Sequence, residues 1–335
     1  MSDRTRIEWA DATWNPVSGC SAVSPGCDHC YAKTLAERFR GVEGHYFEHG
    51  FDVQTRPEKL DQPLRWRRPR KIFVNSVSDL VHSAVTDDFV ARVFAVMAVA
   101  DHHTFLVLTK RPGRMRSLLS NPQFVELVLD KTRGFAAGRK PIAWPLPNVW
   151  LGVSAEDQKW FGVRVPVLLR TPAVVRFVSA EPLLGAITLC CCDGAAYDVR
   201  RHPFLTNPRC ALHGTSRLDW VIAGGESGRH ARPMHPDWAR QLRDQCRVMD
   251  VAFLFKQWGQ WVPSAGGSRD QWLRPDTGAM APWQAGTISQ GRPSSEAIPM
   301  RRVGKRVAGR LLDGRTWDQF PTHAGTVALD PSAVE

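Results

Sequence analysis

The chain has 335 residues, enough to bury a large core and to fold as one α/β domain with additional segments. Its 44 lysines and arginines exceed its 33 aspartates and glutamates, a net charge of +11 that favours polyanionic partners. The first residues are polar, and no apolar run approaches the roughly 20 residues of a membrane helix, which argues against export and membrane insertion. We therefore expect a cytoplasmic protein whose eight cysteines include metal ligands rather than a disulfide framework.

Short apolar runs alternate with helical stretches along the chain. A first strand is predicted within residues 13–19, directly before Cys20, and a helix follows over 30–39. Six later runs are apolar except for Arg176, which is typical of strands buried on both faces: 72–74, 105–108, 149–153, 174–178, 220–223 and 251–255. Helices are predicted between them over 87–100, 157–170 and 236–249. This order predicts an α/β fold, a partial TIM-like barrel of six or seven βα units.

Two regions interrupt the alternation. Residues 186–217 form an insertion between the fifth and sixth strands, counting the strand before Cys20 as the first. Residues 262–297 are rich in Gly, Pro, Ser and Gln and are predicted to be loops, and a basic helix is predicted over 301–312. We expect the barrel within residues 1–261 and a C-terminal extension over 262–335 that covers the barrel face.

Three cysteines near the start of the chain, Cys20, Cys27 and Cys30, have the spacing C-x6-C-x2-C. A closed zinc site needs four protein ligands, and no fourth cysteine is nearby. Three thiolates on one loop suit a metal centre with an open position, such as a [4Fe–4S] cluster with one iron free for another ligand. A zinc site completed by His29, His45 or a distant cysteine is the alternative.

A second set of potential ligands lies in the insertion. It comprises Cys190, Cys191, Cys192, Cys210 and His213, of which Cys191, Cys192, Cys210 and His213 are the candidate ligands of a second metal. The C-x2-H spacing of the last two is typical of a zinc knuckle, and an auxiliary cluster is another interpretation. Neighbouring side chains on a strand diverge, so three adjacent cysteines do not easily bind one ion, and buried apolar cysteines explain the set equally well.

Polar residues follow the predicted strands. In a barrel, the carboxyl ends of the strands converge on one face, so these side chains are expected to form a cofactor site there. The candidates are Asn75, Ser76, Ser78, Ser154, Glu156, Ser179, Glu181, Gly224, Gly225 and Glu226. Lys110 and Arg111 at the same face can meet an anionic substrate, and a solvated loop explains them equally well. The basic segment 65–71 is the densest candidate for nucleic-acid contact.

The three-cysteine loop after the first strand of a partial barrel resembles the radical S-adenosylmethionine (SAM) enzymes. Over nearly the whole chain, the sequence is similar to a phage-associated bacterial family that is described as radical-SAM-like and has no settled function. The motifs that carry this similarity, besides the cysteine loop, are Ile7-Glu8-Trp9, Trp14-Asn15-Pro16, Gly224-Gly225-Glu226-Ser227-Gly228 and Gly309-Arg310-Leu311-Leu312-Asp313-Gly314-Arg315. The chain departs from the usual C-x3-C-x2-C spacing, and its Gly-Gly-Glu motif follows the sixth strand instead of the second. Gly224-Gly225-Glu226 could therefore serve the adenine or the substrate instead of the SAM amino group.

The resemblance implies that Cys20, Cys27 and Cys30 bind three irons of a [4Fe–4S] cluster and that SAM chelates the fourth. It implies that an external electron donor reduces the cluster, that SAM is cleaved, and that a 5′-deoxyadenosyl radical abstracts hydrogen from the substrate. The charge of the chain favours a nucleic acid or a nucleotide as this substrate. The alternatives are a non-catalytic, zinc-binding protein associated with nucleic acid, and a radical SAM enzyme that acts on a partner protein.

Overall fold

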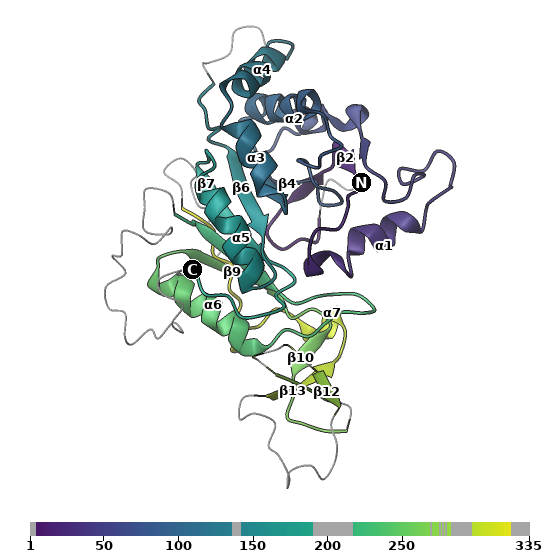
Figure 1. The fold of residues 1–335 in the computed structure, drawn as a ribbon, viewed down its shortest axis with the longest axis vertical. Coiled ribbons are helices and arrows are strands. Elements are labelled where there is room, and N and C mark those ends of the chain that lie inside the picture. The colour runs from purple at the N-terminus through teal and green to yellow at the C-terminus, as the bar shows by residue number, and fades with distance from the viewer. Residues whose placement is uncertain are drawn as a thin grey trace.

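The computed structural model describes residues 5–135, 142–189, 217–268, 270–274, 276, 278, 280–282 and 297–322. Its centre is a sheet of parallel strands that curls into a half-barrel, with helices along its outer face (Figure 1). The seven strands follow one another in chain order: β1 (Ala12–Trp14), β4 (Lys71–Val74), β5 (Thr104–Thr109), β6 (Val149–Ser154), β7 (Val175–Ala180), β8 (Trp220–Gly224) and β9 (Ala252–Gln257). The predicted α/β class and the parallel sheet are therefore confirmed.

The apolar runs of the sequence form these strands, with ends that differ by no more than two residues. The first strand differs more, because β1 ends at Trp14 and the chain then forms a separate short strand, β2 (Val17–Ser18). That strand pairs with β3 (Gln54–Thr55) in an antiparallel sheet. Pro16 lies at the break, and a proline cannot donate a ladder hydrogen bond. The strand predicted over 13–19 is thus wrong as a single element.

The predicted helices correspond to α1 (Tyr31–Glu37), α2 (Asp87–Val99), α5 (Gln158–Leu169) and α6 (Pro236–Val248). The side chain of Thr86 accepts a hydrogen bond from the amide of Phe89 and caps α2, whose first turn carries acidic residues that favour the positive end of a helix. The unpredicted elements in this part are α3 (Pro112–Leu119), α4 (Pro122–Thr132) and three 3₁₀ turns, η1 (Pro25–Cys27), η2 (Pro57–Lys59) and η3 (Gln62–Arg65).

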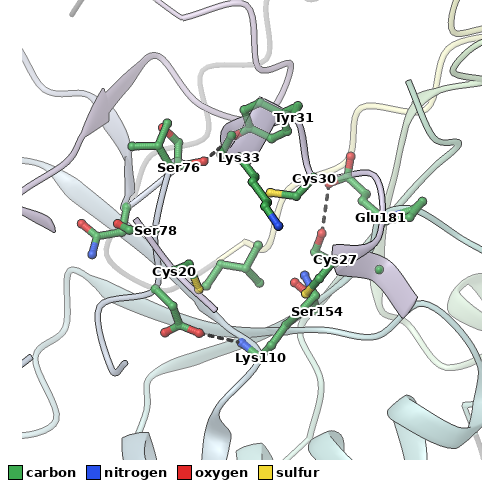
Figure 2. A pocket seen from close by; sticks show the side chains of 18 of the residues that line it. Cys20, Cys27, Cys30, Tyr31, Lys33, Ser76, Ser78, Lys110, Ser154 and Glu181 are labelled. Atoms are coloured by element: carbon green, nitrogen blue, oxygen red, sulfur yellow. Dashed lines mark hydrogen bonds between the residues drawn. The ribbon is translucent and has the colours of Figure 1, made fainter. Parts of the chain in front are cut away.

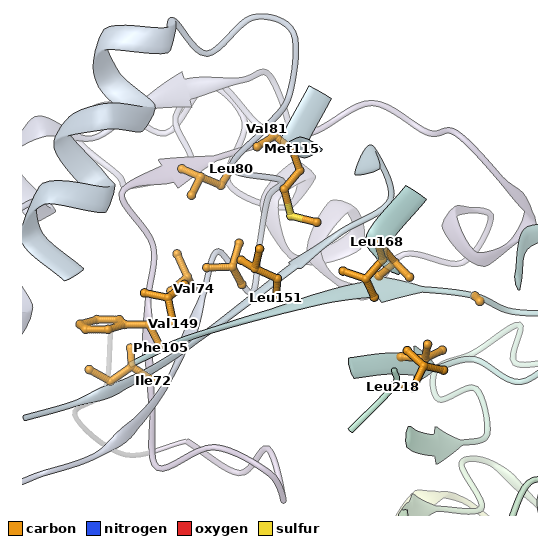
Figure 3. Packing of buried hydrophobic residues seen from close by; sticks show 14 of the residues in the cluster. Ile72, Val74, Leu80, Val81, Phe105, Met115, Val149, Leu151, Leu168 and Leu218 are labelled. Carbon is orange, nitrogen blue, oxygen red and sulfur yellow. The ribbon is translucent and has the colours of Figure 1, made fainter. Parts of the chain in front are cut away.

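Apolar side chains fill both faces of the sheet. On the outer face, residues such as Val74, Phe105 and Leu151 pack against Met115 and Leu168 of the covering helices (Figure 3). A second cluster fills the concave face and comprises Trp9, Phe73, Leu106, Trp150, Val175, Phe177, Trp220, Ile222 and Leu254, with Phe320 packed against it. Because side chains alternate between the faces of a strand, the next inward residues of β6, β7 and β9 are Ser154, Ser179 and Lys256. The apolar filling of the half-barrel therefore gives way to polar groups at the carboxyl ends of the strands.

Gly152 is one position where this inner packing requires a glycine. A Cβ atom there would lie 2.4 Å from the ring of Phe177, which is fully buried. We expect Gly152→Ala to lower the free energy of unfolding by about 1–3 kcal/mol, the usual cost of overpacking. Gly162→Ala on α5 is the matched control, because nothing lies within 4 Å of its Cβ position, and it should leave stability unchanged or raise it. Equal denaturant midpoints for the wild type and Gly152→Ala would contradict the described packing.

The C-terminal part contains a second sheet that is antiparallel. Its order is β10 (Trp261–Pro263), β13 (Ile298–Arg302), β11 (Gln271–Leu273) and β12 (Met280–Pro282). The prediction of loops over 262–297 is wrong for the described strands, which share a small core of Trp261, Leu273 and Met300. The basic helix predicted over 301–312 is also wrong, since only α7 (Lys305–Ala308) is helical. Gly304 and Gly309 flank it with positive φ angles and end it on both sides.

Among the described residues, no helix has the length and apolar character to cross a membrane.

Candidate metal centre and cofactor cavity

A cavity of about 970 Å³ lies at the carboxyl ends of the half-barrel strands, and all three loop cysteines line it (Figure 2). Most of the predicted cofactor residues line the same cavity: Asn75, Ser76, Ser78, Ser154, Ser179, Glu181, Gly225 and Glu226. Two predicted residues, Glu156 and Gly224, are not among the lining residues. The convergence expected of barrel strand ends therefore brings the cysteines and the polar groups to one place.

The cysteine loop is built from short turns. The amide of Cys27 donates to the carbonyl of Ser24 at 2.8 Å in the 3₁₀ turn η1, and Cys30 is the N-cap residue of α1. Cys20 stands at the other end of the loop, where its amide donates to the carbonyl of Phe51 at 3.2 Å. Its neighbour Gly19 has a φ of +79°, which only glycine adopts without strain.

Glu156 holds the middle of the loop from behind. Its Oε1 accepts a hydrogen bond from the amide of Gly26 at 3.1 Å, and its Oε2 accepts one from Nη1 of Arg164 at 2.9 Å. Both side chains of this ion pair are 1% exposed. The same Nη1 donates to the carbonyl of Ser154 on β6 at 2.8 Å. Glu156 thus faces the cysteine loop, and its position favours a role in fixing the loop to the sheet.

Glu226, two residues after the end of β8, also fixes the cysteine loop. Its Oε2 lies 3.1 Å from Nδ1 of His29 and accepts from the Arg232 amide at 2.7 Å. The Arg232 guanidinium donates to Glu226 Oε1 at 2.7 Å, to the carbonyl of Pro25 at 2.8 Å and to Asp28 at 3.2 Å. Burial alone would raise the pKa of Glu226, but the hydrogen bonds from Arg232 and His29 outweigh it and lower that pKa. The carboxylate is therefore held in its charged form.

The lowered pKa of Glu226 predicts a pH dependence of stability. A carboxyl group whose pKa is depressed on folding stabilises the protein above its unfolded pKa, about 4.3 for a glutamate. That contribution is lost as the pH falls through the folded value. We expect Glu226→Gln to be less stable than the wild type at pH 7, with a difference in unfolding free energy that shrinks below about pH 4.5. Denaturant titrations from pH 7 to pH 3 measure it, and a difference that grows toward low pH would contradict the pairing.

Cys20 lies in a polar network at the end of β5. Nη1 of Arg111 is 3.4 Å from Sγ of Cys20 and 3.0 Å from Asp79, which also accepts from the hydroxyl of Thr109. Burial, followed by the charge of Asp79, raises the pKa of the Cys20 thiol, while Arg111 opposes both. Arg111, expected from the sequence to meet an anionic substrate, is thus paired with Asp79 and donates to the cysteine. The hydrogen bond from Arg111 favours the thiolate, but burial and the charge of Asp79 outweigh it and keep the pKa raised.

Other lining residues present polar groups to the cavity. Glu181 pairs with Nζ of Lys256 at 2.8 Å and accepts from Ser179 at 3.1 Å. Asn75 has a φ of +62° and is 2% exposed, and neither atom of its amide group has a hydrogen-bond partner among the described residues. Oε1 of Gln257 is likewise buried and without a partner in the described part of the chain. Buried polar groups normally have partners, so both point to a ligand.

The two glycines of the Gly-Gly-Glu motif have a packing reason in this structure. A Cβ at Gly225 would lie 1.9 Å from the carbonyl oxygen of Trp258, and the Gly225 amide donates to the carbonyl of Gln257 at 2.9 Å. A Cβ at Gly224 would lie 3.2 Å from Oε1 of Glu181. Glycine is thus required at 225, where β8 ends beside β9, whereas at 224 only the end of the Glu181 side chain would have to shift. The motif also brings Glu226 to the loop.

Some residues of the site were not identified from the sequence. Arg232 bridges the loop to Glu226, and Lys33 lines the cavity. Lys33 follows Cys30 by three residues at the start of a helix, and this spacing places two side chains on one helix face. That signal was available in the sequence. Its partners in the loop, Pro25 and Asp28, lie about two hundred residues away in the chain, and no local pattern indicates them.

The alternative zinc site needs His29, His45 or a distant cysteine to complete its ligands. Nδ1 of His29 contacts Glu226, and His45 stacks on Phe39 with 3.9 Å between the ring centres. No three His, Cys, Asp or Glu side chains within the described ranges form a group able to hold a single metal ion. In a [4Fe–4S] cluster each cysteine binds a different iron, so its ligands do not surround one ion. Cys190, Cys191, Cys192, Cys210 and His213 lie outside the described residues.

Comparison with known proteins gives one match. No curated protein and no solved structure matches the chain. A family model with the description "Protein of unknown function (DUF5131)" matches residues 4–321, nearly the whole length of the chain. The chain therefore belongs to the DUF5131 family.

Proposed function

We propose that this protein is a radical SAM enzyme whose cluster is held by Cys20, Cys27 and Cys30. The observation that carries the proposal is that these cysteines open onto one cavity at the carboxyl ends of a half-barrel. That cavity also contains a buried amide, Asn75, without a partner in the described chain. Three cysteines leave one iron of a [4Fe–4S] cluster free for SAM. Held by Cys20, Cys27 and Cys30 and reduced by an external electron donor, the cluster would supply the electron for reductive cleavage of SAM.

The residues of the chain have separate tasks in this proposal. Glu156 and Glu226 hold the cysteine loop against β6 and β8, so the sulfur atoms are positioned before any cofactor binds. Asn75, Ser154 and Ser179 line the cavity and offer hydrogen bonds to the polar groups of SAM. The apolar filling of the half-barrel below them excludes water from the amino side, which protects a reactive intermediate.

Asn75 gives a direct test of SAM binding. Asn75→Gly removes an amide that has no partner in the described chain, and glycine adopts the same positive φ without strain. We expect this variant to remain folded and to bind SAM about tenfold more weakly, the loss of one buried hydrogen bond to a ligand. Titration calorimetry on the anaerobic, iron-loaded protein measures the affinity.

Asp250→Gly is the matched control, because Asp250 also has a positive φ, of 51°, but does not line the cavity. It should bind SAM as the wild type does. Equal SAM affinities for the wild type and Asn75→Gly would show that Asn75 does not bind SAM. A wild-type protein that neither binds SAM nor releases 5′-deoxyadenosine after reduction with dithionite would contradict the proposed function itself.

A further inference from the structure

The cavity carries positive charge that the described chain does not neutralise. Every carboxylate among its lining residues already has a cation as its partner. Glu37 and Asp52 pair with Arg40, Asp79 with Arg111, Glu181 with Lys256, and Glu226 with Arg232. Because Glu37 and Asp52 share the one charge of Arg40, these pairs together keep a single negative charge, fewer than the further cations of the lining supply.

Three lining cations have no ion-pair partner within the ranges that the structure describes: Arg6, Lys33 and Lys110. The Lys33 side chain extends into the space that Cys20 and Cys30 border (Figure 2). Lys110 follows the last residue of β5 at the carboxyl end of the sheet. Arg6 is exposed and lines the cavity from the N-terminal segment that leads into β1. The positive groups therefore come from three segments that the fold brings together around one space.

The proposed cofactors do not account for this charge. A [4Fe–4S] core with two positive charges and three thiolates carries one net negative charge. An amino group that binds iron is not protonated, so SAM bound through its amino and carboxylate groups keeps a sulfonium and a carboxylate and has no net charge. The cluster and the Glu37–Arg40–Asp52 group thus supply two negative charges against the three positive charges of Lys33, Lys110 and Arg6, and a positive excess remains. Unpaired cations around a concave surface raise the local concentration of anions and bind them.

Gln257 indicates what the anion is attached to. Its Oε1 is a buried acceptor that lines the cavity and has no partner in the described chain. The base edges of nucleotides carry N–H donors that an amide oxygen accepts, and their phosphates pair with lysine and arginine. A nucleotide unit meets both features, whereas a simple carboxylate or inorganic phosphate would leave the acceptor of Gln257 without a partner.

We propose that Lys33 and Lys110, with Arg6, bind the phosphate of a nucleotide substrate, either a free nucleotide or one unit of a single nucleic-acid strand. This inference rests on the proposed function for its charge balance, and it names the substrate class of that same site. The basic segment 65–71, favoured by its sequence, lies at the amino end of β4. The cavity lies at the opposite, carboxyl end, so that segment does not provide these phosphate contacts.

Fluorescence anisotropy of a labelled single-stranded DNA of about 20 nucleotides, with the anaerobic, iron-loaded and SAM-bound protein, tests the proposal. We expect Lys33→Gln and Lys110→Gln each to weaken binding about three- to tenfold and to lower the slope of log affinity against log salt by about one. Arg67→Gln, on an exposed residue of segment 65–71, is the control and should bind within twofold of the wild type. The iron content of every variant is measured in parallel.

Competition by uridine 5′-monophosphate distinguishes the two sources of the phosphate, because a pyrimidine does not imitate the adenine of SAM. If uridine 5′-monophosphate competes and uridine does not, the substrate is a free nucleotide. If uridine 5′-monophosphate does not compete, but strand binding depends on Lys33, the substrate is a nucleic-acid strand. Iron-loaded protein that binds neither probe at 50 mM salt, or binding that Arg67→Gln weakens as much as Lys33→Gln does, would overturn the inference. If the same preparation nevertheless cleaves SAM, only the inference about the substrate is overturned, and the proposed function is not contradicted.

Discussion

Gly19→Ala is expected to lower both the stability of the protein and its capacity to hold iron. Gly19 precedes Cys20, and a Cβ there would lie 2.1 Å from the carbonyl oxygen of Asp52. Backbone atoms cannot approach so closely, so the segment around Asp52 must move. The hydrogen bond from the Cys20 amide to Phe51 belongs to this segment. The substitution therefore displaces the first cysteine of the loop.

The expected cost has two parts. An alanine at a φ of +79° costs about 1–2 kcal/mol in any surroundings. The steric conflict adds about 1–3 kcal/mol of overpacking. Gly41→Ala separates the two, because Gly41 also has a φ of +79° but nothing within 4 Å of its Cβ position. We expect Gly41→Ala to show only the first cost and to keep its iron, and Gly19→Ala to lose more than half of the iron. Equal stability and iron content in the two variants would refute this account of the loop.

Arg164→Met is expected to produce the second large effect. Arg164 and Glu156 are both 1% exposed, and removing one member of a buried ion pair leaves the other as an uncompensated charge. Such changes cost about 3–5 kcal/mol. Methionine retains much of the packing of the long side chain, so the loss of charge dominates. Because Glu156 also accepts from the Gly26 amide, we expect the cysteine loop to lose its anchor and the iron content to fall.

The double variant Arg164→Met with Glu156→Gln tests the cause. It leaves no buried charge, and the glutamine oxygen still accepts from the Gly26 amide. Its free energy of unfolding should therefore exceed that of Arg164→Met alone, and its iron content should recover. Chemical denaturation and iron analysis measure both quantities. A double variant less stable than Arg164→Met would show that packing, and not the unpaired charge, causes the loss.

The sequence predicted six of the seven half-barrel strands well because each of the six is a mainly apolar run, whereas the first strand lacks one. The run 149–153 is an example, since every residue of β6 is buried. The C-terminal sheet lacked such a signal. Its strands are short, and its core depends on Trp261, Leu273 and Met300, which are far apart in the chain. The helix predicted over 301–312 failed because Gly304 and Gly309 end the helix within one turn.

The candidate site, like the fold, was predicted from the sequence only in part. The spacing of Cys20, Cys27 and Cys30 was enough to bring the cysteines to one cavity, since a short loop cannot spread them far. The tasks of Glu156 and Glu226 were not predictable. Each follows a strand, as a cofactor ligand would, and only the positions of Arg164 and Arg232 in three dimensions show that these carboxylates face the loop.

Iron and sulfide content, measured with an absorption spectrum after anaerobic preparation, tests the central claim most directly. The variants are Cys27→Ala and, as control, Cys246→Ala, since Cys246 is buried on α6 away from the cavity. We predict about four irons and four sulfides per chain and a broad band near 400 nm in the wild type and the control, and their loss in Cys27→Ala. Zinc without sulfide in the wild type, or iron retained in Cys27→Ala, would contradict the proposed cluster.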